Sequence, residues 1–413
     1  MTNPQIYDTV SAGRKSEKKT DHPGKTKKHQ KEPTMIYASI VVLAIGLYAM
    51  TITLTNIITM HNQRMRRQDK TPKVSVCIPA RNEEANIVNC VHSFQKQDYP
   101  DYEILVLDDN SEDSTASLVQ ALAEKDDRIR LIKGKPLPSG WRGKVYAMKQ
   151  LVDSAKGEYI LFTDADTIHK PISIRSGIDL LLTNNAKMVS GYPLEVSDSA
   201  WALSCVAIMV MNTMIYLPIA IQNKMQLSPL AMAIGQYIMV EKKSLLEAGG
   251  LEAIKDVMGD DVNLARLFCN SGHKQIFANM KYALSCRMYN TLGEAIKGME
   301  RGFFGAIKLN PVMKALLPPG VVFLTLLALL PLISLVLMIA TSFSVPSIIL
   351  AAGTALIYTA YGIITHYHSY KFPVPLMGSE TFFFCGLLLA KGMFHHFSNR
   401  PIEWKGRKVT YDK

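Results

Sequence analysis

The chain has 413 residues, of which 48% are hydrophobic and only 20% are charged. With a mean hydropathy of +0.08, this composition argues against a wholly soluble protein and excludes a disordered chain, a collagen-like chain and a small disulfide-stabilised domain. The 46 Lys and Arg residues exceed the 35 Asp and Glu residues by 11. That excess fits an anionic partner such as nucleic acid, an anionic lipid surface or a phosphorylated substrate.

The N-terminal region divides into a polar tail and an apolar segment. Residues 1–34 are rich in Gly, Pro, Lys and Thr and lack apolar periodicity, which predicts a disordered basic tail. Residues 35–60 carry no charge and are long enough, at about 1.5 Å per residue, to cross a hydrocarbon core of about 30 Å. We expect a transmembrane helix. The basic residues that follow predict that the next domain faces the cytoplasm and that the tail lies outside; they are Arg64, Arg66, Arg67, Lys70 and Lys73.

A soluble domain is expected over residues 61–310, with its core at residues 74–290. Short apolar, β-branched runs alternate there with segments of helical periodicity. The runs lie at residues 74–78, 103–107, 130–132, 159–163 and 187–191. This alternation predicts an α/β fold whose sheet is largely parallel and is flanked by helices on both faces. Ligands of such sheets bind beyond the carboxyl ends of the strands.

Apolar segments return near the C-terminus. Residues 321–340 and 345–364 are uncharged, and the short link between them predicts a helical hairpin through the bilayer. Residues 374–394 contain Glu380 and Lys391, so this stretch is either a third span or a re-entrant or interfacial segment.

Two further boundaries follow. Residues 311–398 therefore hold two or three transmembrane or interfacial helices, and residues 399–413 form a basic C-terminal tail. Residues 201–221, inside the soluble region, are also uncharged and long enough to span a membrane. A crossing there would separate Asp260 and Asp261 from the earlier carboxylates, so we favour a membrane-facing or core helix that borders the acceptor entrance.

Three of the predicted strands are followed by candidate site residues, most of them charged. They are Pro79, Arg81 and Glu83 after residues 74–78, Asp108 and Asp109 after residues 103–107, and Asp164 and Asp166 after residues 159–163. Carboxylates at one edge repel one another unless a cation or hydrogen-bond donors compensate them. Asp164 and Asp166 suit Mg²⁺ or Mn²⁺ that bridges a diphosphate. An isolated Asp-x-Asp is more commonly a capping loop, but the neighbouring acidic strand ends favour the metal.

Two roles are possible for the region of Asp108 and Asp109. Ser111 or Asp113, which follow it, could cap a helix that starts near Ser114. Alternatively, the pair accepts hydrogen bonds from a pyrimidine N–H or a ribose hydroxyl, and this recognition role is the one we favour.

Residues 137–148 place Lys144 on a glycine-containing loop before a helix. Pro138 and Val145 stand where a Walker loop needs Gly and Ser or Thr, so that motif is excluded. Lys144 is a point charge for a phosphate, and Trp141 is either an aromatic platform or a plug on the membrane side. Asp260 and Asp261 open a predicted helix; one can complement the helix N-terminus, and the other can deprotonate a hydroxyl nucleophile.

In this order and spacing, five segments resemble the family 2 glycosyltransferases, whose GT-A domain uses a nucleotide-sugar donor. They are IPARNEE, LVLDDNSEDST, LPSGWRGK, FTDADT and GDDVNLARL. LPSGWRGK, RMYNTLGEAIKGMERGFFGA and IEWKGRKV are more similar still to the membrane-bound branch that acts in carotenoid and hopanoid pathways. The resemblance covers residues 74–408 and implies a GT-A-type mixed, mainly parallel sheet, with transmembrane helices at both ends of the chain.

The resemblance also implies roles for individual residues. Pro79, Arg81, Glu83 and Asp109, with Asp108 beside them, would frame the uridine, Lys144 would contact phosphate, and Asp164 and Asp166 would hold the diphosphate through Mg²⁺ or Mn²⁺. Asp261 would be the catalytic base, next to Asp260 where the family pattern usually has Glu. Trp141 and Arg301 are the candidates for acceptor contact. The Q-x-x-R-W signature of processive relatives is missing. Gly298, Arg301 and Gly302 stand in the corresponding places, which favours one sugar per acceptor.

The predicted function is the inverting, non-processive transfer of a hexose from a nucleotide sugar, with a UDP-sugar preferred, to a hydroxyl or carboxyl group of a membrane lipid or isoprenoid. The predicted location is the cell membrane, with several spans and a cytoplasmic catalytic domain. A transporter or channel component is an alternative, which requires ionisable residues within spans. A catalytically silent glycosyltransferase-like scaffold is another. Nucleic-acid binding is disfavoured, because no basic patch is interleaved with aromatic residues.

Overall fold

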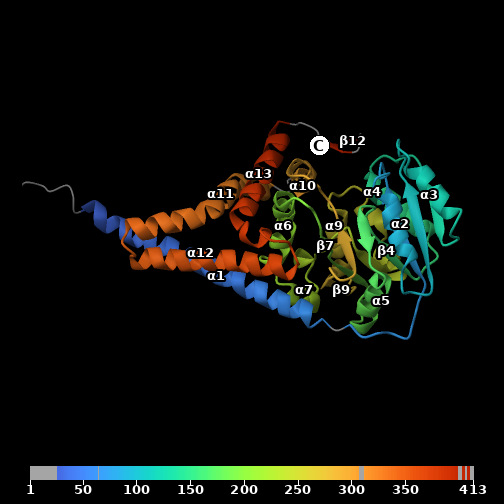
Figure 1. Ribbon diagram of the computed structural model, residues 1–413, viewed down its shortest axis with the longest axis horizontal. Helices are drawn as coiled ribbons and strands as arrows, with labels where there is room; N and C mark the ends of the chain where they lie inside the picture. The colour runs from blue at the N-terminus through green and yellow to red at the C-terminus, as the bar shows by residue number, and fades with distance from the viewer. Residues whose placement is uncertain (1–25, 64, 307–310, 399–401, 405–406, 410–413) are drawn as a thin grey trace, which may run out of the picture.

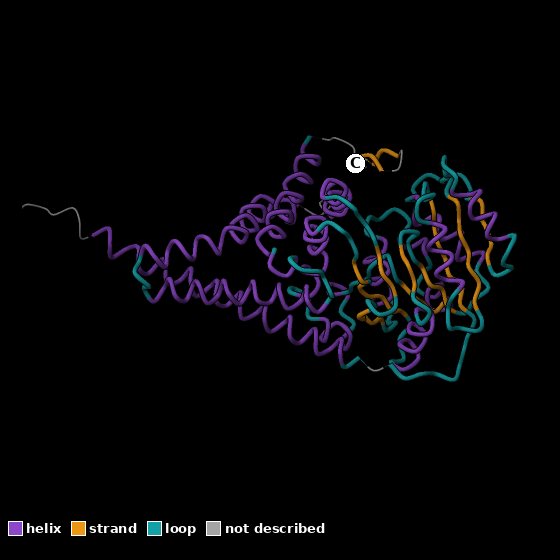
Figure 2. Tube along the Cα trace, in the orientation of Figure 1, coloured by secondary structure: helices purple, strands orange, loops and turns teal. Residues whose placement is uncertain are grey.

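The structure, a computed structural model, describes residues 26–63, 65–306, 311–398, 402–404 and 407–409 (Figure 1). An α/β domain occupies one end of the elongated molecule, and a bundle of long helices extends away from it. Figure 2 shows that the strands are concentrated in the domain and that the bundle is helical. The predicted α/β architecture is therefore confirmed, and the described part of the chain consists of an α/β domain and a helical bundle.

The main sheet has seven strands in the order β3-β2-β1-β4-β8-β6-β9. Their bounds are β1 Val74–Ala80, β2 Tyr102–Asp108, β3 Ile129–Lys133, β4 Tyr159–Phe162, β6 Met188–Tyr192, β8 Ile238–Glu241 and β9 Gln275–Asn279. All five predicted strands are present. β8 and β9 were not predicted, and β8 is antiparallel to both of its neighbours, β4 and β6. A second, three-stranded sheet pairs β5 Thr167–His169, β10 Leu284–Cys286 and β7 Leu194–Glu195.

Helices cover both faces of the main sheet. α2 Ile87–Gln95, α3 Thr115–Ala123 and α5 Ser173–Thr183 pack on one face, while α4 Gly143–Ser154, α8 Lys242–Glu247 and α9 Asp260–Asn270 pack on the other. Alternate residues of a strand point to opposite faces, so Val76 and Ile78 of β1 join the first core and Cys77 joins the second. Burial on both faces explains why β1 and β2 are continuous apolar runs.

Three helices are long and apolar enough to cross a membrane, and the described residues offer a fourth span if one bent helix pair is counted. The three are α1 Thr26–His61, α11 Pro311–Ala340 and α12 Val345–Tyr367. Figure 1 shows that α1 and α12 run toward the α/β domain and that α11 runs away from it. The predicted hairpin of α11 and α12 is confirmed. The helix α1 begins at Thr26, so the prediction of a disordered tail up to residue 34 was wrong for its last part; residues 1–25 lie outside the described residues.

The helices α1 and α12 pack at very short range through two glycines. A Cβ on Gly46 would lie 2.6 Å from the carbonyl oxygen of Gly353, and a Cβ on Gly353 would lie 2.6 Å from the backbone nitrogen of Leu43. Small residues of this kind allow membrane helices to approach closely, which increases van der Waals contact where the hydrophobic effect contributes little.

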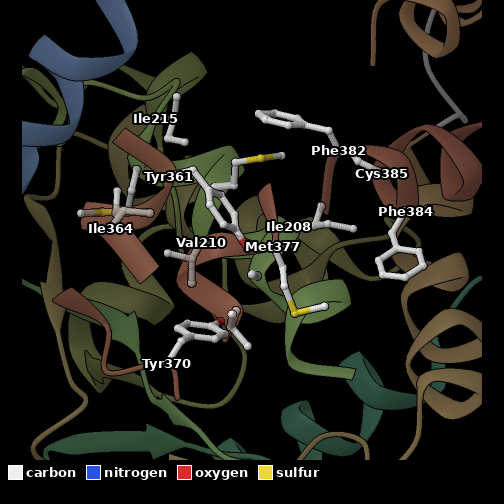
Figure 3. Packing of buried hydrophobic residues seen from close by; sticks show 14 of the residues in the cluster. Ile208, Val210, Ile215, Tyr361, Ile364, Tyr370, Met377, Phe382, Phe384 and Cys385 are labelled. Carbon is white, nitrogen blue, oxygen red and sulfur yellow. The ribbon is translucent and has the colours of Figure 1, made fainter. Parts of the chain in front are cut away.

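The apolar segment predicted at residues 201–221 forms two helices, α6 Ala200–Met214 and α7 Ile219–Met225, bent by 52°. Most of α6 is buried among α10 Leu292–Ala306, α12 and α13 Gly378–Phe397 (Figure 3). It is therefore a core helix of the bundle. Ser204, Tyr361 and Thr381 fasten it to its neighbours, because the Thr381 hydroxyl lies 2.8 Å from each of the other two hydroxyls.

The break between α6 and α7, next to Pro218, exposes backbone polar groups inside the bundle. Asn56 of α1 is fully buried there and satisfies three of them. Its amide Nδ2 donates to the carbonyl oxygens of Met214 (3.0 Å) and Leu217 (2.7 Å), and its Oδ1 accepts from the backbone N–H of Ile219 (2.9 Å). One side chain of the first membrane helix thus stabilises a bend some 160 residues later in the chain.

The ionisable residues of the third C-terminal stretch lie on α13, which is not one of the three candidate spans. Lys391 and His395 of α13 both contact the buried carboxylate of Glu300, at 3.0 and 2.9 Å. This ion-pair network ties α13 to α10. The described parts of the predicted basic tail form a two-stranded hairpin, β11 Ile402–Trp404 with β12 Arg407–Val409. Short 3₁₀ helices complete the fold at Ser228–Leu230, Leu251–Ile254 and Val374–Leu376.

Replacement of Asn56 tests the capping of this break. We expect Asn56→Leu to lower the melting temperature of the detergent-solubilised protein by several degrees, because each buried polar group left without a partner costs about 1–3 kcal/mol. The matched control is Thr55→Val, since the exposed Thr55 hydroxyl bonds only within its own helix. Equal melting temperatures for wild type and Asn56→Leu would contradict this role.

Candidate active site

A cleft of about 380 Å³ lies at the carboxyl ends of β1, β2 and β4. The predicted residues that line it are Pro79, Arg81, Glu83, Asp109, Lys144, Asp164 and Asp166. Asn82, Asn86, Met288 and Tyr289, which were not predicted, line it as well. The parallel strands bring together segments that are far apart in the sequence, and most of the side chains that they place here are polar or charged.

The ends of β1 and β2 are held together by Arg81. Its Nη1 donates to the carbonyl oxygens of Asp109 (2.7 Å) and Asn110 (3.1 Å), and the Asp109 N–H donates to the carbonyl oxygen of Ala80 (2.8 Å). The Glu83 carboxylate accepts from Asn86 Nδ2 at 3.0 Å. Arg81 therefore has a structural task, and it also contributes positive charge to the cleft wall.

Asp108 and Asp109 separate into two roles. Asp109 lines the cleft, whereas Asp108 is only 7% exposed and does not line it. The Asp108 carboxylate accepts from the Ser111 backbone N–H at 3.1 Å, which holds the turn after β2. The N-cap residue of α3 is Ser114, and Asp113, the residue before it, accepts from the Thr115 N–H through its Oδ1 at 3.0 Å. The expectation that Asp108 contacts the donor is thus replaced by a turn-stabilising role.

Asp164 and Asp166 lie on the loop between β4 and β5. Asp166 Oδ1 is buried and has no hydrogen-bond partner among the described residues. Burial, together with the neighbouring charges of Asp164 and Glu83, raises the pKa of Asp166 to about 7. A buried carboxylate oxygen without a partner is destabilising unless a ligand satisfies it. This oxygen is therefore available to a cation.

A buried hydrogen-bond network, which we call the threonine–histidine network, holds the backbone of the loop that carries Asp164 and Asp166. It consists of Thr163, Thr167, His169, Ser173 and Gln236. Thr163 Oγ1 lies 2.9 Å from both Thr167 Oγ1 and His169 Nε2, and the Thr167 hydroxyl donates to the carbonyl oxygen of Asp164 at 2.7 Å. Burial lowers the pKa of His169 to about 3, so its ring is neutral at pH 7. Sequence patterns did not indicate these residues as a group.

Lys144 is the second residue of α4 and not, as predicted, part of the preceding loop. Its Nζ lies 2.7 Å from Asp164 Oδ1 and 3.7 Å from Asp260 Oδ2. Burial by itself would lower the pKa of Lys144, but the carboxylates of Asp164, Asp260 and Asp261 outweigh burial and raise it. Lys144 is therefore charged, and it offsets the repulsion between carboxylates that come from separate parts of the chain.

Asp260 and Asp261 form the first turn of α9, as predicted, behind Gly259 at a φ of +74°. Asp261 Oδ1 accepts from the Val262 N–H at 2.8 Å, and Oδ2 accepts from the Gly235 N–H at 3.2 Å. Burial and the adjacent charge of Asp260 raise the pKa of Asp261 to about 6. This carboxylate is mostly ionised at pH 7 and remains a usable proton acceptor.

Gly235 marks the point at which these groups converge. A Cβ built on it would lie 3.2 Å from Lys144 Nζ, 3.5 Å from Asp164 Oδ2 and 3.9 Å from Asp261 Oδ2. Only a residue without a side chain leaves this space open. Sequence reasoning missed Gly235, because the glycine becomes informative only when the three side chains around it are known.

The two candidate acceptor residues lie elsewhere. Trp141 is not part of the cleft lining; its ring packs edge-on against Tyr146, with 5.3 Å between centroids, beside the core under α4. Arg301 is in α10, but its side chain lies outside the described residues.

Residues 75–247 match the family described as Glycosyl transferase family 2. The matched segment is less than half of the chain, and it agrees with the predicted enzyme class. The GalNAc(5)-diNAcBac-PP-undecaprenol beta-1,3-glucosyltransferase of Campylobacter jejuni is 39% identical over 95 residues, 23% of this chain and 30% of that protein. A beta-monoglucosyldiacylglycerol synthase of Trichormus variabilis is 30% identical over 136 residues, 32% of this chain and 28% of that protein. The alignments thus span less than a third of these relatives.

The fold extends beyond the matched segment. A mannosyltransferase from Pyrobaculum calidifontis, solved in complex with GDP-Man and Mn²⁺, superposes with a TM-score of 0.51 at 16% identity. The superposition covers 89% of this chain and 99% of that one. At this identity the similarity concerns the fold, and it confirms the predicted GT-A architecture.

Replacement of His169 tests the support of the Asp164–Asp166 loop. We expect His169→Leu to reduce the stability of the fold by about 1–3 kcal/mol, because it leaves buried Thr163 and Ser173 hydroxyls without the ring as a partner. A melting curve measures this loss, at roughly 2–4 °C per kcal/mol for a domain of this size. Lys170→Ala, at an exposed neighbouring position, is the control. A melting temperature equal to that of the control would contradict the role.

Proposed function

We propose that this protein is an inverting, non-processive glycosyltransferase that moves a hexose from a nucleotide sugar, preferentially a UDP-sugar, to a hydroxyl or carboxyl group of a membrane lipid or isoprenoid. The observation that carries the proposal is the convergence of Lys144, Asp164 and Asp261 around Gly235, beside a cleft lined by Asp109 and Asp166. The similarity of the C-terminal segments to the carotenoid and hopanoid branch supports an isoprenoid-type acceptor, and relatives whose names include undecaprenol and diacylglycerol support a lipid acceptor more generally.

The cleft offers separate contacts for the nucleoside and the diphosphate of the donor. Pro79, Glu83 and Asp109 form the wall where the nucleoside would bind, and carboxylates there can accept from a base N–H or from ribose hydroxyls. Lys144 would contact the diphosphate and stabilise the negative charge that develops on the leaving group.

A divalent cation fits Asp164 and Asp166. Asp166 Oδ1 needs a partner, and carboxylate oxygens are hard ligands of the kind that Mg²⁺ and Mn²⁺ prefer. Among the described residues there is no group of three or more His, Cys, Asp or Glu side chains arranged to hold a metal. Two protein ligands suffice when phosphate oxygens and water complete the coordination. When bound, the cation would neutralise the diphosphate and assist its departure.

The chain's own residues would act in a single displacement. The acceptor oxygen attacks the anomeric carbon from the face opposite the diphosphate, and its proton passes to the Asp261 carboxylate. The bond between that carbon and the phosphate oxygen breaks, and its electron pair leaves with the nucleoside diphosphate. The configuration inverts, and Asp260 and Lys144 hold the charge balance around Asp261 during the transfer.

The membrane helices position the domain at the lipid surface. α1 and α12 enter the domain from the same side, and basic residues follow α1. By the positive-inside rule the domain faces the cytoplasm, where nucleotide sugars are available, and the start of α1 faces the opposite side.

The base assignment predicts a specific loss in Asp261→Asn. Transfer should fall by about 10²- to 10⁴-fold, the usual contribution of general base catalysis, while nucleotide binding measured by calorimetry stays within a few-fold. Wild-type transfer should also decline about tenfold per pH unit below pH 6, because protonation of Asp261, whose pKa is raised to about 6, removes the base. The control is Asp256→Asn, at an exposed aspartate close to α9. Wild-type rates in Asp261→Asn would overturn the assignment.

The metal assignment predicts weaker cation binding in Asp166→Asn. Loss of an outer-shell partner usually reduces metal affinity about 10- to 100-fold, so we expect at least that loss for a direct ligand. Electron paramagnetic resonance of free Mn²⁺ in the presence of UDP measures the affinity, and chelation by EDTA should abolish transfer. The exposed Asp127→Asn variant serves as control. Unchanged Mn²⁺ affinity in Asp166→Asn would contradict this site.

A further inference from the structure

Helices α6, α10, α11 and α13 enclose a groove of about 580 Å³ that is separate from the donor cleft. Its lining is mainly apolar: Trp201, Leu292, Ala328, Leu329, Phe383 and Phe384. We call it the bundle groove. The mechanism described above does not use it, and its walls come from parts of the chain that lie outside the family 2 match at residues 75–247, except for the start of α6.

We propose that the bundle groove holds the hydrocarbon chain of an uncharged lipid alcohol, whose hydroxyl group is the acceptor. This inference rests on the proposed function and narrows it. It names the substrate class, a neutral alcohol. A lipid phosphate would need positively charged residues between the membrane and the cleft, whereas a neutral alcohol would not.

The groove lies at the depth of the hydrocarbon layer. Ala328 and Leu329 are near the middle of the candidate span at residues 315–340. Trp201 is 51% exposed, and its ring meets Phe384 edge-on with 6.4 Å between centroids. A lipid chain could therefore enter sideways from the bilayer without exposing its apolar surface to water.

Residues that line the bundle groove follow closely in the sequence on residues that line the donor cleft. Met288 and Tyr289 line the cleft, and Leu292, the first residue of α10, lines the groove. Tyr289 and Leu292 are three residues apart, so their Cα atoms are separated by at most about 11 Å. Ser199 also lines the groove, and its side chain caps α6. A lipid with its chain in the groove would therefore place its polar end toward the cleft.

An ion pair lies in the segments that connect the two sites. Arg287 Nη1 donates to Asp198 Oδ2 at 2.9 Å. Arg287 directly precedes the cleft residue Met288, and Asp198 directly precedes the groove residue Ser199. Arg287 is therefore paired with a carboxylate in this structure, although both side chains are exposed and such surface pairs are weak.

Charge disfavours an anionic acceptor. None of the described residues that line the groove is basic, and Glu380, one of its polar members, is acidic. In the cleft lining, the four carboxylates outnumber Arg81 and Lys144, and Lys144 is already paired with Asp164. A phosphate group on the acceptor would add negative charge to this surface, where like charges repel one another strongly because burial limits solvent screening. A hydroxyl group avoids this repulsion and can donate to Glu380 on its way to Asp261.

Trp201 supplies a direct test of occupancy that does not depend on activity. The chain contains Trp141, Trp201 and Trp404, so the double variant Trp141→Phe/Trp404→Phe leaves Trp201 as the fluorophore. The full chain in phosphatidylcholine nanodiscs is titrated with diacylglycerol, phosphatidic acid or phosphatidylcholine that carries the same brominated chains. We expect brominated diacylglycerol to quench Trp201 at least twofold more than the other two at equal mole fraction. Equal quenching by all three lipids, or stronger quenching by phosphatidic acid, would overturn the proposal.

A groove-filling variant connects occupancy to transfer. In the background that keeps Trp201 as the fluorophore, Ala328→Phe should reduce sugar transfer to lipid at least tenfold and abolish the selective quenching, while calorimetric UDP binding stays unchanged. The matched control is Leu332→Phe, at a position on the same helix that is 59% exposed and does not line the groove. If transfer and selective quenching both survive in Ala328→Phe, the groove is not the acceptor site. If wild-type protein binds no nucleotide and transfers no sugar, the proposed function itself fails, whereas the quenching result still tests the groove as a neutral-lipid site.

Discussion

The charge of Lys144 allows the acidic centre of this protein to exist. Asp164 follows a strand, Asp260 and Asp261 begin a helix nearly a hundred residues later, and the ammonium group lies within 4 Å of two of these carboxylates. Without it, burial and mutual repulsion would favour protonated acids, as the raised pKa values of Asp166 and Asp261 already indicate. The ammonium group of Lys144 balances only part of the negative charge of these aspartates. The remaining negative charge favours a ligand that binds together with a divalent metal ion, and it disfavours a second anionic substrate.

The α/β domain and the helical bundle meet at the bent helix pair α6 and α7. Asn56 of α1 forms hydrogen bonds with the backbone groups that the bend exposes. α6 in turn borders the bundle groove, and the segment that enters α10 connects that groove to the cleft. Under the proposed function, a water-soluble donor and a lipid would therefore meet at a fixed point, which converts an encounter between two phases into a positioned reaction.

Similarity to known proteins covers these parts unequally. The family 2 match includes the strand ends that carry Arg81, Asp109 and the Asp164–Asp166 loop, but it stops before α9 and Asp261. The long superposition with the mannosyltransferase concerns the fold alone. The argument for Asp261 consequently comes from geometry, since this carboxylate lies beside Lys144 and Asp164 around the open space at Gly235.

Features that local sequence encodes were predictable. Periodicity and composition predicted the apolar runs of β1, β2 and β4 and the hairpin of α11 and α12, because burial requires apolar residues throughout a short segment. The acidic residues after three of the strands were visible in the sequence as well. Tertiary structure alone decided the rest. It separated Asp108, which holds a turn, from Asp109, which lines the cleft. It also packed Trp141 against the domain core and inserted β8 antiparallel between β4 and β6. Asn56 and Gly235 matter through partners more than 20 residues away, and such contacts leave no periodic trace in the sequence.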